Sequence, residues 1–408
     1  MKPTNLHKSP FNLAVIAAGL GFFVDAFDLF LFSIYRIPSL TELGLTGDAL
    51  KAEGEKLLAV QMLGMMIGGI LTGIIGDRKG RVAVLFGSIL LYSAANIANA
   101  FVGDTTSYAI IRFLAGVGLA GELGAGITLV SESMTIERRG YGTILVATMG
   151  AAGAVCAGLA GDLLPWRTAF FAAGIAGLLL LLLRMKSMET TMFKQTENIS
   201  VQQKGSFQYL FSDRKRTLRY LGCILMGVPI WFSVGLLITL SPELAKDHHI
   251  DGWALTKAFT LFQIGITAGD LTSGIISQLL KTRKKVVLGY MLLAVASTVY
   301  FFSEFENSNT NYISCFLMGL GCGYLSVFVT ATAEHFGTNL RVLVSATVTN
   351  FMRGSVTLLI PFHLWLESRF NFTLASSLII TGILVWSLAL TSTLLLKETY
   401  GKDLNYSE

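Results

Sequence analysis

The stretch Gly73-Ile-Ile-Gly-Asp77-Arg78-Lys79-Gly80-Arg81 organises the rest of this sequence. Apolar runs at residues 57–75 and 82–102 flank it, and each is long enough to cross a bilayer as a helix. A charged turn this short makes the two helices antiparallel neighbours. Gly73 allows close approach of the two backbones, and Gly80 can supply the positive φ angle that ends a tight turn.

The composition is typical of a membrane protein that crosses the bilayer many times. The chain has 408 residues, 53% of them hydrophobic and only 14% charged, whereas about a quarter of the residues in soluble proteins are charged. The apolar residues gather in blocks of roughly 20 that recur along the whole chain. The 42 glycines agree with this interpretation, because small residues let membrane helices pack closely.

Charge and cysteine content exclude several other classes of protein. The net charge of +5 is not a nucleic-acid signal, because Lys and Arg concentrate in the segments that we expect on the cytoplasmic side of a membrane. The four cysteines lie inside apolar runs without metal-like spacing, so we interpret them as core residues. We expect no cleavable signal peptide, since the first apolar run is too long and carries two aspartates.

Two aspartates stand at membrane depth in the first apolar run, residues 11–34. Asp25 and Asp28 are three residues apart and therefore share one helix face. Ionisable groups at this depth are costly and usually face an interior pathway, so both are candidate functional groups. The alternative is a pair of charges that stabilises helix packing.

A second set of charges lies in the run at residues 108–130. It begins with Arg112, continues with a ladder of glycines and carries Glu122 at mid-membrane. Small residues let helices approach closely. We therefore expect the ladder to bring another backbone close, so that Arg112 and Glu122 reach across to the first helix.

The second half of the sequence repeats the first. Residues 274–277 are a degenerate copy of residues 73–76 at an offset of 201, and residues 316–321 echo residues 113–118 at an offset of 203. Matches at nearly the same offset indicate a duplicated six-helix unit in parallel orientation. The second half has its own charges at membrane depth, and Arg353 is one of them.

Asp270 and Arg353 are the candidate substrate-binding residues of the second half. Arg353 could bind an anionic group of a substrate, with Asp270 as its counter-ion or as a second titrating site. The alternative is a purely structural ion pair.

We therefore expect an all-α membrane protein of about 12 transmembrane helices, in two pseudo-symmetric six-helix halves around a central cavity. Residues 1–186 form the N-terminal half and residues 218–408 form the C-terminal half with a short cytoplasmic tail. Residues 187–217, rich in Lys, Gln and Ser, are expected to be a cytoplasmic linker, and both chain ends are expected on the same side.

The opening stretch has the spacing Gly, three residues, Asp, Arg, any residue, Gly, Arg. This spacing resembles the signature loop of the major facilitator superfamily, with Gly73, Asp77, Arg78, Gly80 and Arg81 in the matching positions. In that family the loop joins the second and third membrane helices on the cytoplasmic side. The resemblance implies that its charges latch the two halves while the transporter is open outward. The alternative is a generic basic loop that follows the positive-inside rule.

Further motifs resemble the metabolite–proton symporter branch, which is related to phosphate, aromatic-acid and sugar symporters. Asp25 and Asp28 match its acidic–x–aromatic–Asp cluster in helix 1. Arg112 and Glu122 match its Arg–x3–Gly–x3–Gly–Gly–Glu–x–Gly motif in helix 4, although Ala120 replaces one glycine. The Tyr-Pro pair of phosphate symporters and the Gly-Pro pair of drug antiporters are missing here.

The branch also has a Glu…Glu-Arg-Arg-Gly stretch after helix 4. Glu132, Glu137, Arg138, Arg139 and Gly140 match it. By this resemblance we assign Glu132, Arg138 and Arg139 to the conformational latch together with the signature loop.

These observations predict a secondary active transporter that moves a small, anionic metabolite with protons by alternating access. Asp25, Asp28 and Glu122 are the proton-carrier candidates and Arg112 is their partner, because a carboxylate that gains or loses an Arg neighbour changes its affinity for a proton. The alternative is a drug or siderophore exporter of the same superfamily. We expect no cofactor, no metal and no enzymatic activity, since no nucleophile–base pair, metal cluster or phosphate loop stands in the sequence.

The expected partners are the metabolite, protons and the lipid bilayer, without nucleic acid, and we expect a functional monomer. Short loops favour the bacterial cytoplasmic (inner) membrane as the location. A membrane-embedded enzyme or a transceptor is the alternative from a different class.

Overall fold

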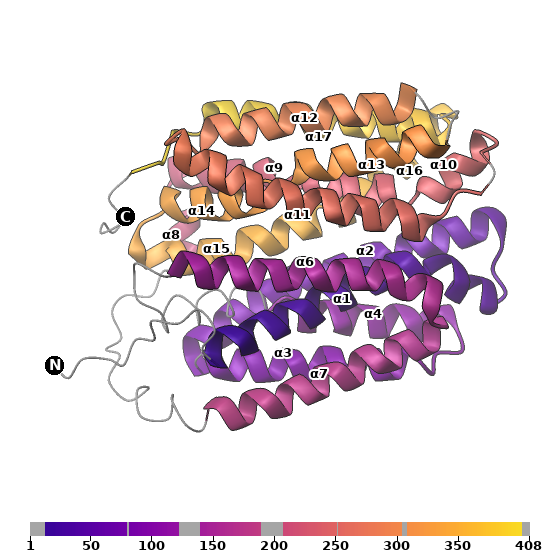
Figure 1. Ribbon diagram of the computed structural model, residues 1–408, viewed down its shortest axis with the longest axis horizontal. Helices are drawn as coiled ribbons and strands as arrows, with labels where there is room; N and C mark the ends of the chain where they lie inside the picture. Colours follow the sequence, from indigo (N-terminus) through magenta and orange to yellow (C-terminus); the bar gives the residue numbers. More distant parts are fainter. Residues whose placement is uncertain are drawn as a thin grey trace.

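The computed structural model describes residues 13–79, 81–121, 139–188, 207–250, 252–303 and 308–401. All regular secondary structure in these residues is helical, and the long helices lie side by side in one bundle (Figure 1). Nine spans in the described part are long and apolar enough to cross a membrane, and three shorter apolar helices join them. Together they confirm the expected all-α membrane protein with 12 helices.

The first six of these helices build the N-terminal half, drawn in indigo to magenta in Figure 1. Residues 73–79 of the signature stretch belong to the second helix, which continues through Lys79, and the third helix begins at Arg81. The six are α1 (Leu13–Glu42), α2 (Gly47–Lys79), α3 (Arg81–Asn99), α4 (Thr105–Leu119), α6 (Arg139–Leu163) and α7 (Trp166–Met188).

The C-terminal half has the same number of spans, several of them broken. Its first span contains Pro229, which has no N–H to donate, and a π-helical turn follows it. The spans are α9 (Arg214–Phe232) with η2 (Ser233–Ile238), α11 (Leu255–Leu279), α12 (Lys284–Ser303), α13 (Ser308–Cys322) with α14 (Leu325–His335), α15 (Thr338–Gly354) with α16 (Val356–Phe370), and α17 (Leu374–Leu395).

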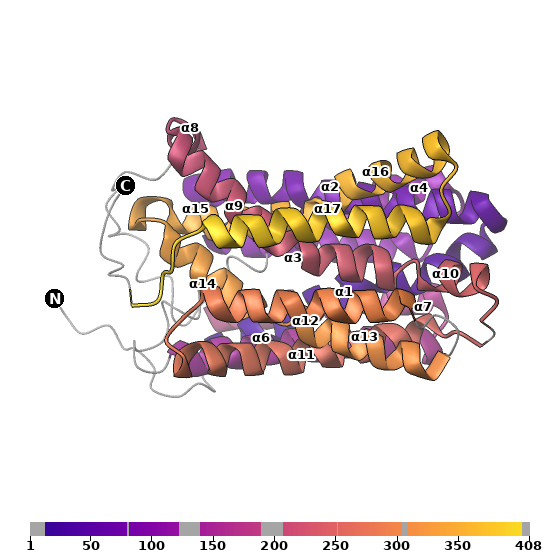
Figure 2. The ribbon, with the colours of Figure 1, turned by 90° about the horizontal axis from the view of Figure 1, so that it is seen from above.

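Two short helices mark the two ends of the bundle. Helix α8 (Phe207–Phe211) lies at one end and α10 (Ser241–Asp247) at the other, as both ribbon views show (Figures 1 and 2). We call these the α8 end and the α10 end. The expected boundaries of the two halves at residues 186 and 218 stay a prediction, with α7 ending at Met188 and α9 beginning at Arg214.

Glycine contacts show that the two halves are copies of one design. A Cβ atom on Gly64 of α2 would collide with the backbone oxygen of Phe113 in α4. A Cβ atom on Gly265 of α11 would collide in the same way with Phe316 in α13. Gly265 follows Gly64 by 201 positions, which is the offset of the sequence repeat. The duplicated sequence therefore builds the same close helix pair twice.

The glycine ladder of α4 does not face α1. A Cβ atom on Gly116 would meet the backbone of Gln61 in α2, and one on Gly118 would lie 2.7 Å from the backbone nitrogen of Tyr92 in α3. Helix α1 packs instead mainly on α6, where Gly153 leaves room for its backbone. The ladder thus fixes α4 within the N-terminal half, and only a long side chain on α4 can reach α1.

The two halves meet along two seams. Helix α2 packs against α15 and α16, and α6 packs against α11. Figure 2 shows α2 beside α16 and α6 beside α11, on opposite sides of the bundle. Charged and polar side chains that the two seams bring together form the candidate site.

Candidate functional site

A cavity of about 500 Å³ lies between the two halves. Helices α1 and α6 line it from the N-terminal half, and α9, η2, α11, α14 and α15 line it from the C-terminal half. Its wall is mostly apolar, with charges from Asp25, Asp270 and Arg353. The lining extends to Gln278 and Arg283, which lie where α11 ends, so the cavity reaches toward the α8 end.

Asp25 and Arg353 face each other across the cavity from opposite halves. Asp25 of α1 is fully buried and Arg353 of α15 is 5% exposed. Asp25 is the charge that acts on the guanidinium of Arg353. The guanidinium also lies 5.6 Å from the ring centroid of Trp231, a cation–π distance. Its Nε and Nη1 atoms make no hydrogen bond within the described residues, so they are available to an anion in the cavity.

Arg112 and Asp28 form a second buried charge pair, inside the N-terminal half. Arg112 Nη2 donates to Oδ1 of Asn96 at 2.8 Å, and the guanidinium stacks 4.7 Å from the Phe170 ring centroid. Asn99, with its amide oxygen turned toward the guanidinium, accepts from Nε at 2.7 Å. Arg112 acts electrostatically on Asp28, whose two carboxylate oxygens make no hydrogen bond of normal geometry in the described part.

Asp270 lies in the cavity wall but has a different partner from the one expected. Its carboxylate accepts the backbone N–H of Ser326 at 2.6 Å, at the beginning of α14. The first N–H groups of a helix have no partner in the helix and attract negative charge. The break between α13 and α14 therefore supplies the donor that holds Asp270, while Arg353 has Asp25 as its counter-ion.

Polar contacts between the halves close the α10 end. Arg36 of α1 forms an ion pair with Glu243 of α10 and donates to the backbone oxygen of Thr239 at 3.0 Å. Lys51 of α2 lies 2.9 Å from Glu367 of α16. Among the described residues, the cavity lining thus extends toward the α8 end, while bonded side chains separate the cavity from the α10 end.

One more contact of this kind involves a histidine. His363 Nε2 of α16 lies 2.9 Å from Glu55 Oε2 of α2, and the two side chains are 0% and 1% exposed. Farther along the other seam, Thr256 of α11 donates to Asp162 of α6 at 2.8 Å. Both seams are thus bonded at the α10 end.

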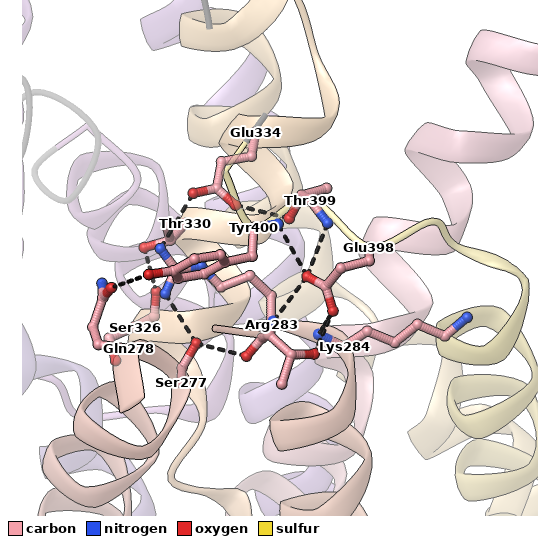
Figure 3. Close-up of polar contacts among 11 residues, drawn as sticks. Ser277, Gln278, Arg283, Lys284, Ser326, Thr330, Glu334, Glu398, Thr399 and Tyr400 are labelled. Carbon is pink, nitrogen blue, oxygen red and sulfur yellow. Dashed lines mark hydrogen bonds and ion pairs between the residues drawn. The ribbon is translucent and has the colours of Figure 1, made fainter. Parts of the chain in front are cut away.

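A network within the C-terminal half occupies the α8 end (Figure 3). Arg283, between α11 and α12, forms a 3.3 Å ion pair with Glu334 of α14 and donates to Ser277 at 2.9 Å. Thr399 donates to the second oxygen of Glu334 at 2.7 Å. The sequence repeat places Arg283 at the counterpart of the signature loop. In the C-terminal half, the positive charge at this position therefore forms an ion pair with a helix of the same half.

Glu398 ties the end of the last span to this network. It accepts the backbone N–H groups of Arg283 at 2.9 Å and Lys284 at 3.2 Å, and the hydroxyl of Thr282. Burial alone would raise the pKa of Glu398, but these hydrogen bonds outweigh it and lower the pKa to about 2. The carboxylate is therefore charged throughout the physiological pH range.

Several predicted site residues lie outside the part of the chain whose side chains the structure describes. Their roles stay predictions. Glu122, Glu132, Arg138 and Gly80 are outside the described residues, and Gly73, Asp77, Arg78, Arg81 and Arg139 are described only as parts of helices.

Sequence reasoning missed the residues that close the α10 end. Arg36, Glu55 and His363 are ionisable groups near the ends of apolar runs, where loops and helix ends are hard to tell apart. Their burial was the signal that mattered. That of Glu55 and His363 arises when α2 and α16 pack together, and Arg36 is bonded where α1 meets α10. The cavity aromatics Phe30 and Trp231, stacked with ring centroids 5.9 Å apart, were missed for the same reason.

Comparison with known proteins gives one family. The model of the Major Facilitator Superfamily matches residues 18–361. The chain is 26% identical over 373 residues to the niacin transporter NiaP of Acinetobacter baylyi (strain ATCC 33305 / BD413 / ADP1), covering 83% of each chain. It is 23% identical over 355 residues to the sialic acid transporter NanX of Escherichia coli (strain K12), covering 84% of each. The family and these relatives are transporters and not enzymes, as expected from the sequence.

A third relative matches a smaller part of the chain. It is the 3-(3-hydroxy-phenyl)propionate transporter of Escherichia coli (strain K12), which is 28% identical over 225 residues, or 53% of this chain and 54% of that protein. The relatives named here carry small molecules across membranes, which agrees with a cavity of about 500 Å³ between two helical halves.

Proposed function

Because this chain belongs to the Major Facilitator Superfamily, we propose that it carries a small anionic metabolite together with protons, by alternating access of one central site. The observation that carries the proposal is the placement of Asp25 and Arg353 on opposite halves, in the wall of one cavity. An anion that enters this cavity meets a guanidinium on which the charge of Asp25 already acts.

Competition for Arg353 couples the anion to a proton. A substrate carboxylate takes up the donors of Arg353, and Asp25 loses the cation that acts on it. An unpaired charge is costly in a buried position, so Asp25 binds a proton and becomes neutral. One anion and one proton then occupy the cavity together, and the filled site has no added net charge to move between the two states.

The apolar part of the cavity favours a cargo with a flat or apolar body. Phe30 and Trp231 stack with an interplanar angle of 10°, one from each half, and Gln263 adds a polar group beside them. Aromatic side chains bind rings by offset stacking. Niacin, sialic acid and 3-(3-hydroxy-phenyl)propionate, the cargoes that the relatives' names give, all carry a carboxylic acid group. These names support a small organic acid as cargo here.

The second charge pair has a supporting role in this scheme. Asp28 lies on α1 together with Asp25 and has Arg112 of α4 as its charge partner, and both Asp28 and Arg112 are buried. A change in the position of α1 therefore acts on both aspartates. We assign to Asp25 the proton binding that accompanies substrate binding. We assign to Asp28 and Arg112 the stabilisation of the proton-bound and proton-free forms of the transporter. Glu122 keeps its predicted place in this set.

We assign the α8 end to the cytoplasm and the α10 end to the outside. Basic residues gather at the α8 end, at Arg214, Lys215 and Arg216 and again at Lys284 and Lys285, which agrees with the positive-inside rule. The state described is then open to the cytoplasm. The bacterial relatives support the cytoplasmic membrane as the location, and a monomer contains the whole cavity.

The signature residues keep their assigned role as the latch of the outward-open state. In the C-terminal half, the ion pair of Arg283 with Glu334 joins the loop between two spans to the helix after the next, within that half. By the repeat, Arg78 or Arg81 would meet Glu132 in the N-terminal half.

Transport by purified protein in proteoliposomes tests the proposal. With an inward pH gradient, the wild type should accumulate radiolabelled nicotinate, sialic acid or benzoate, and Asp25→Asn should lose accumulation while it keeps exchange of internal for external substrate. Asp48→Asn, an exposed acid at the start of α2, is the matched control and should behave as wild type. Accumulation by Asp25→Asn equal to that of the wild type would refute the role of Asp25, and no response of the wild type to the gradient would refute proton coupling.

A further inference from the structure

A buried histidine lies in the seam between α2 and α16, well away from the charges in the cavity wall. His363 is fully buried, its Nε2 lies 2.9 Å from Glu55 Oε2, and its Nδ1 lies 3.5 Å from Glu367 Oε1. Glu55 belongs to the N-terminal half, whereas His363 and Glu367 belong to the C-terminal half. The three side chains are together only while the α10 end is closed.

The negative and positive charges around His363 do not balance while the histidine is neutral. Lys51 Nζ lies 2.9 Å from Glu367 Oε2, and from α17 Ser377 donates to Glu367 at 3.1 Å without adding charge. Lys51 thus compensates one of the two carboxylates. Among the described residues, Glu55 is compensated only when His363 carries a proton.

Charged side chains on the neighbouring helices do not change this net charge around His363. From α1, Arg36 packs against Gly54 of α2, where an added Cβ atom would lie 2.7 Å from its side chain. Arg36 is already paired with Glu243 of α10, so these two have no net charge together. The buried group of Glu55, His363, Glu367 and Lys51 is therefore neutral with one extra proton and carries one negative charge without it.

We propose that Glu55 and His363 form a proton-binding site in the outer seam, which is filled from the outside when the α10 end closes. This inference rests on the proposed alternating access, and it adds a site that is separate from Asp25 and Asp28. The proton belongs to the pair as a unit, since two ionisable groups this close titrate together. Opening of the seam exposes the pair to outside water, where the negative charge is solvated and the proton can leave.

A proton on the Glu55–His363 pair favours the closed state for an electrostatic reason. A net charge buried between two halves is costly, whereas a neutral hydrogen-bonded group is not. Closure therefore takes up one proton from the outside. By linkage, uptake of one proton changes the ratio of closed to open molecules by up to about tenfold per pH unit.

Distance measurement between the two halves tests this inference without substrate. Spin labels at Lys56→Cys on α2 and Ser368→Cys on α16 are placed on exposed positions, in a background where the exposed Cys156 is replaced by serine. Pulsed electron spin resonance in lipid nanodiscs gives the closed and open populations between pH 5.5 and 8.5. The closed population should rise as pH falls.

Two variants should shift the populations in opposite directions. His363→Gln removes the cation beside Glu55, so closure then needs a proton on the carboxylate itself, and the open state should dominate over the pH range measured. Glu55→Gln makes the buried group neutral without a proton, so the closed state should dominate. Glu55→Gln should lose the pH response, whereas His363→Gln should show closure only at lower pH than the wild type. Asp48→Asn is the control, because this exposed acid at the start of α2 lies outside the group of charges around His363 and its loss should keep the pH response of the wild type.

A pH response in both variants equal to that of the wild type would overturn the inference. Opening of the seam by both variants would also overturn it, because loss of a structural hydrogen bond loosens the seam in either case. If His363→Gln does not fold, the closed and pH-independent behaviour expected of Glu55→Gln decides alone. Failure here is distinguishable from failure of the proposed function, which is measured as gradient-driven accumulation by the wild type.

Discussion

Removal of the charge of Glu243 is the sharpest test of how the α10 end is held closed. Arg36 is fully buried and pairs across the seam with Glu243, which is 17% exposed. Glu243→Gln leaves the guanidinium with a neutral partner, and Arg36 keeps its hydrogen bond to the Thr239 carbonyl at 3.0 Å. Loss of a hydrogen bond between charged groups in a mostly buried place costs about 2–3 kcal/mol.

This cost falls on the closed state alone, because the pair is separated and hydrated once the seam opens. The ratio of open to closed molecules should therefore rise about 30- to 150-fold. The rate at which an impermeant maleimide labels a cysteine placed at Thr239 from outside measures this ratio. Glu53→Gln is the matched control, since Glu53 pairs only with Lys56 of its own helix at an exposed position. Equal labelling rates for the parent, Glu243→Gln and Glu53→Gln would refute the role of this ion pair as a closing contact.

Three other predictions concern the cavity, the packing and the α8 end. Arg353→Gln should raise the KM for an anionic substrate about 10- to 100-fold, with a smaller effect for Arg353→Lys, measured by initial uptake rates. Gly265→Ala should lower the free energy of unfolding by about 1–3 kcal/mol, because its Cβ atom collides with backbone, whereas Gly87→Ala has open space and should be neutral in the same thermal denaturation assay. Glu398 has a lowered pKa of about 2, so its contribution to stability is present above the unfolded pKa of about 4.3 and is lost as the pH falls toward 2. The melting temperature of Glu398→Gln should therefore lie below that of the parent by the same amount at pH 6 and pH 8, and the two should converge below about pH 4.

The sequence predicted the parts of this fold that depend on local pattern. Apolar blocks of membrane length became the spans, and the offset between residues 73–76 and 274–277 became a repeated helix pair. The signature stretch was expected as a turn but is helical up to Lys79, because nothing before it breaks the helix of α2. A glycine before a charged run does not by itself end a helix whose backbone hydrogen bonds continue past it.

The sequence could not show which charged residues and which helices lie against one another. Asp25 and Arg353 are separated by more than 300 positions, and their pairing depends on how two six-helix units face each other. The glycine ladder of α4 was recognised in the sequence, but its partner helices were not. Glycine spacing indicates that some helix packs closely, and it does not identify that helix. Glu55 and His363 were missed for the same reason, since each has an ordinary place in its own helix.

The interlocked glycines within each half have a mechanical consequence. Because Gly64 and Gly265 each leave no room between their helices, neighbouring spans of one half cannot slide past each other. Under the proposed alternating access, each half would then turn as a lever whose pivot lies along the two seams. A lever moves its two ends in opposite directions, so one rotation that pulls the α10 end apart must also bring the α8 end together, and a single cross-link at either end would arrest both.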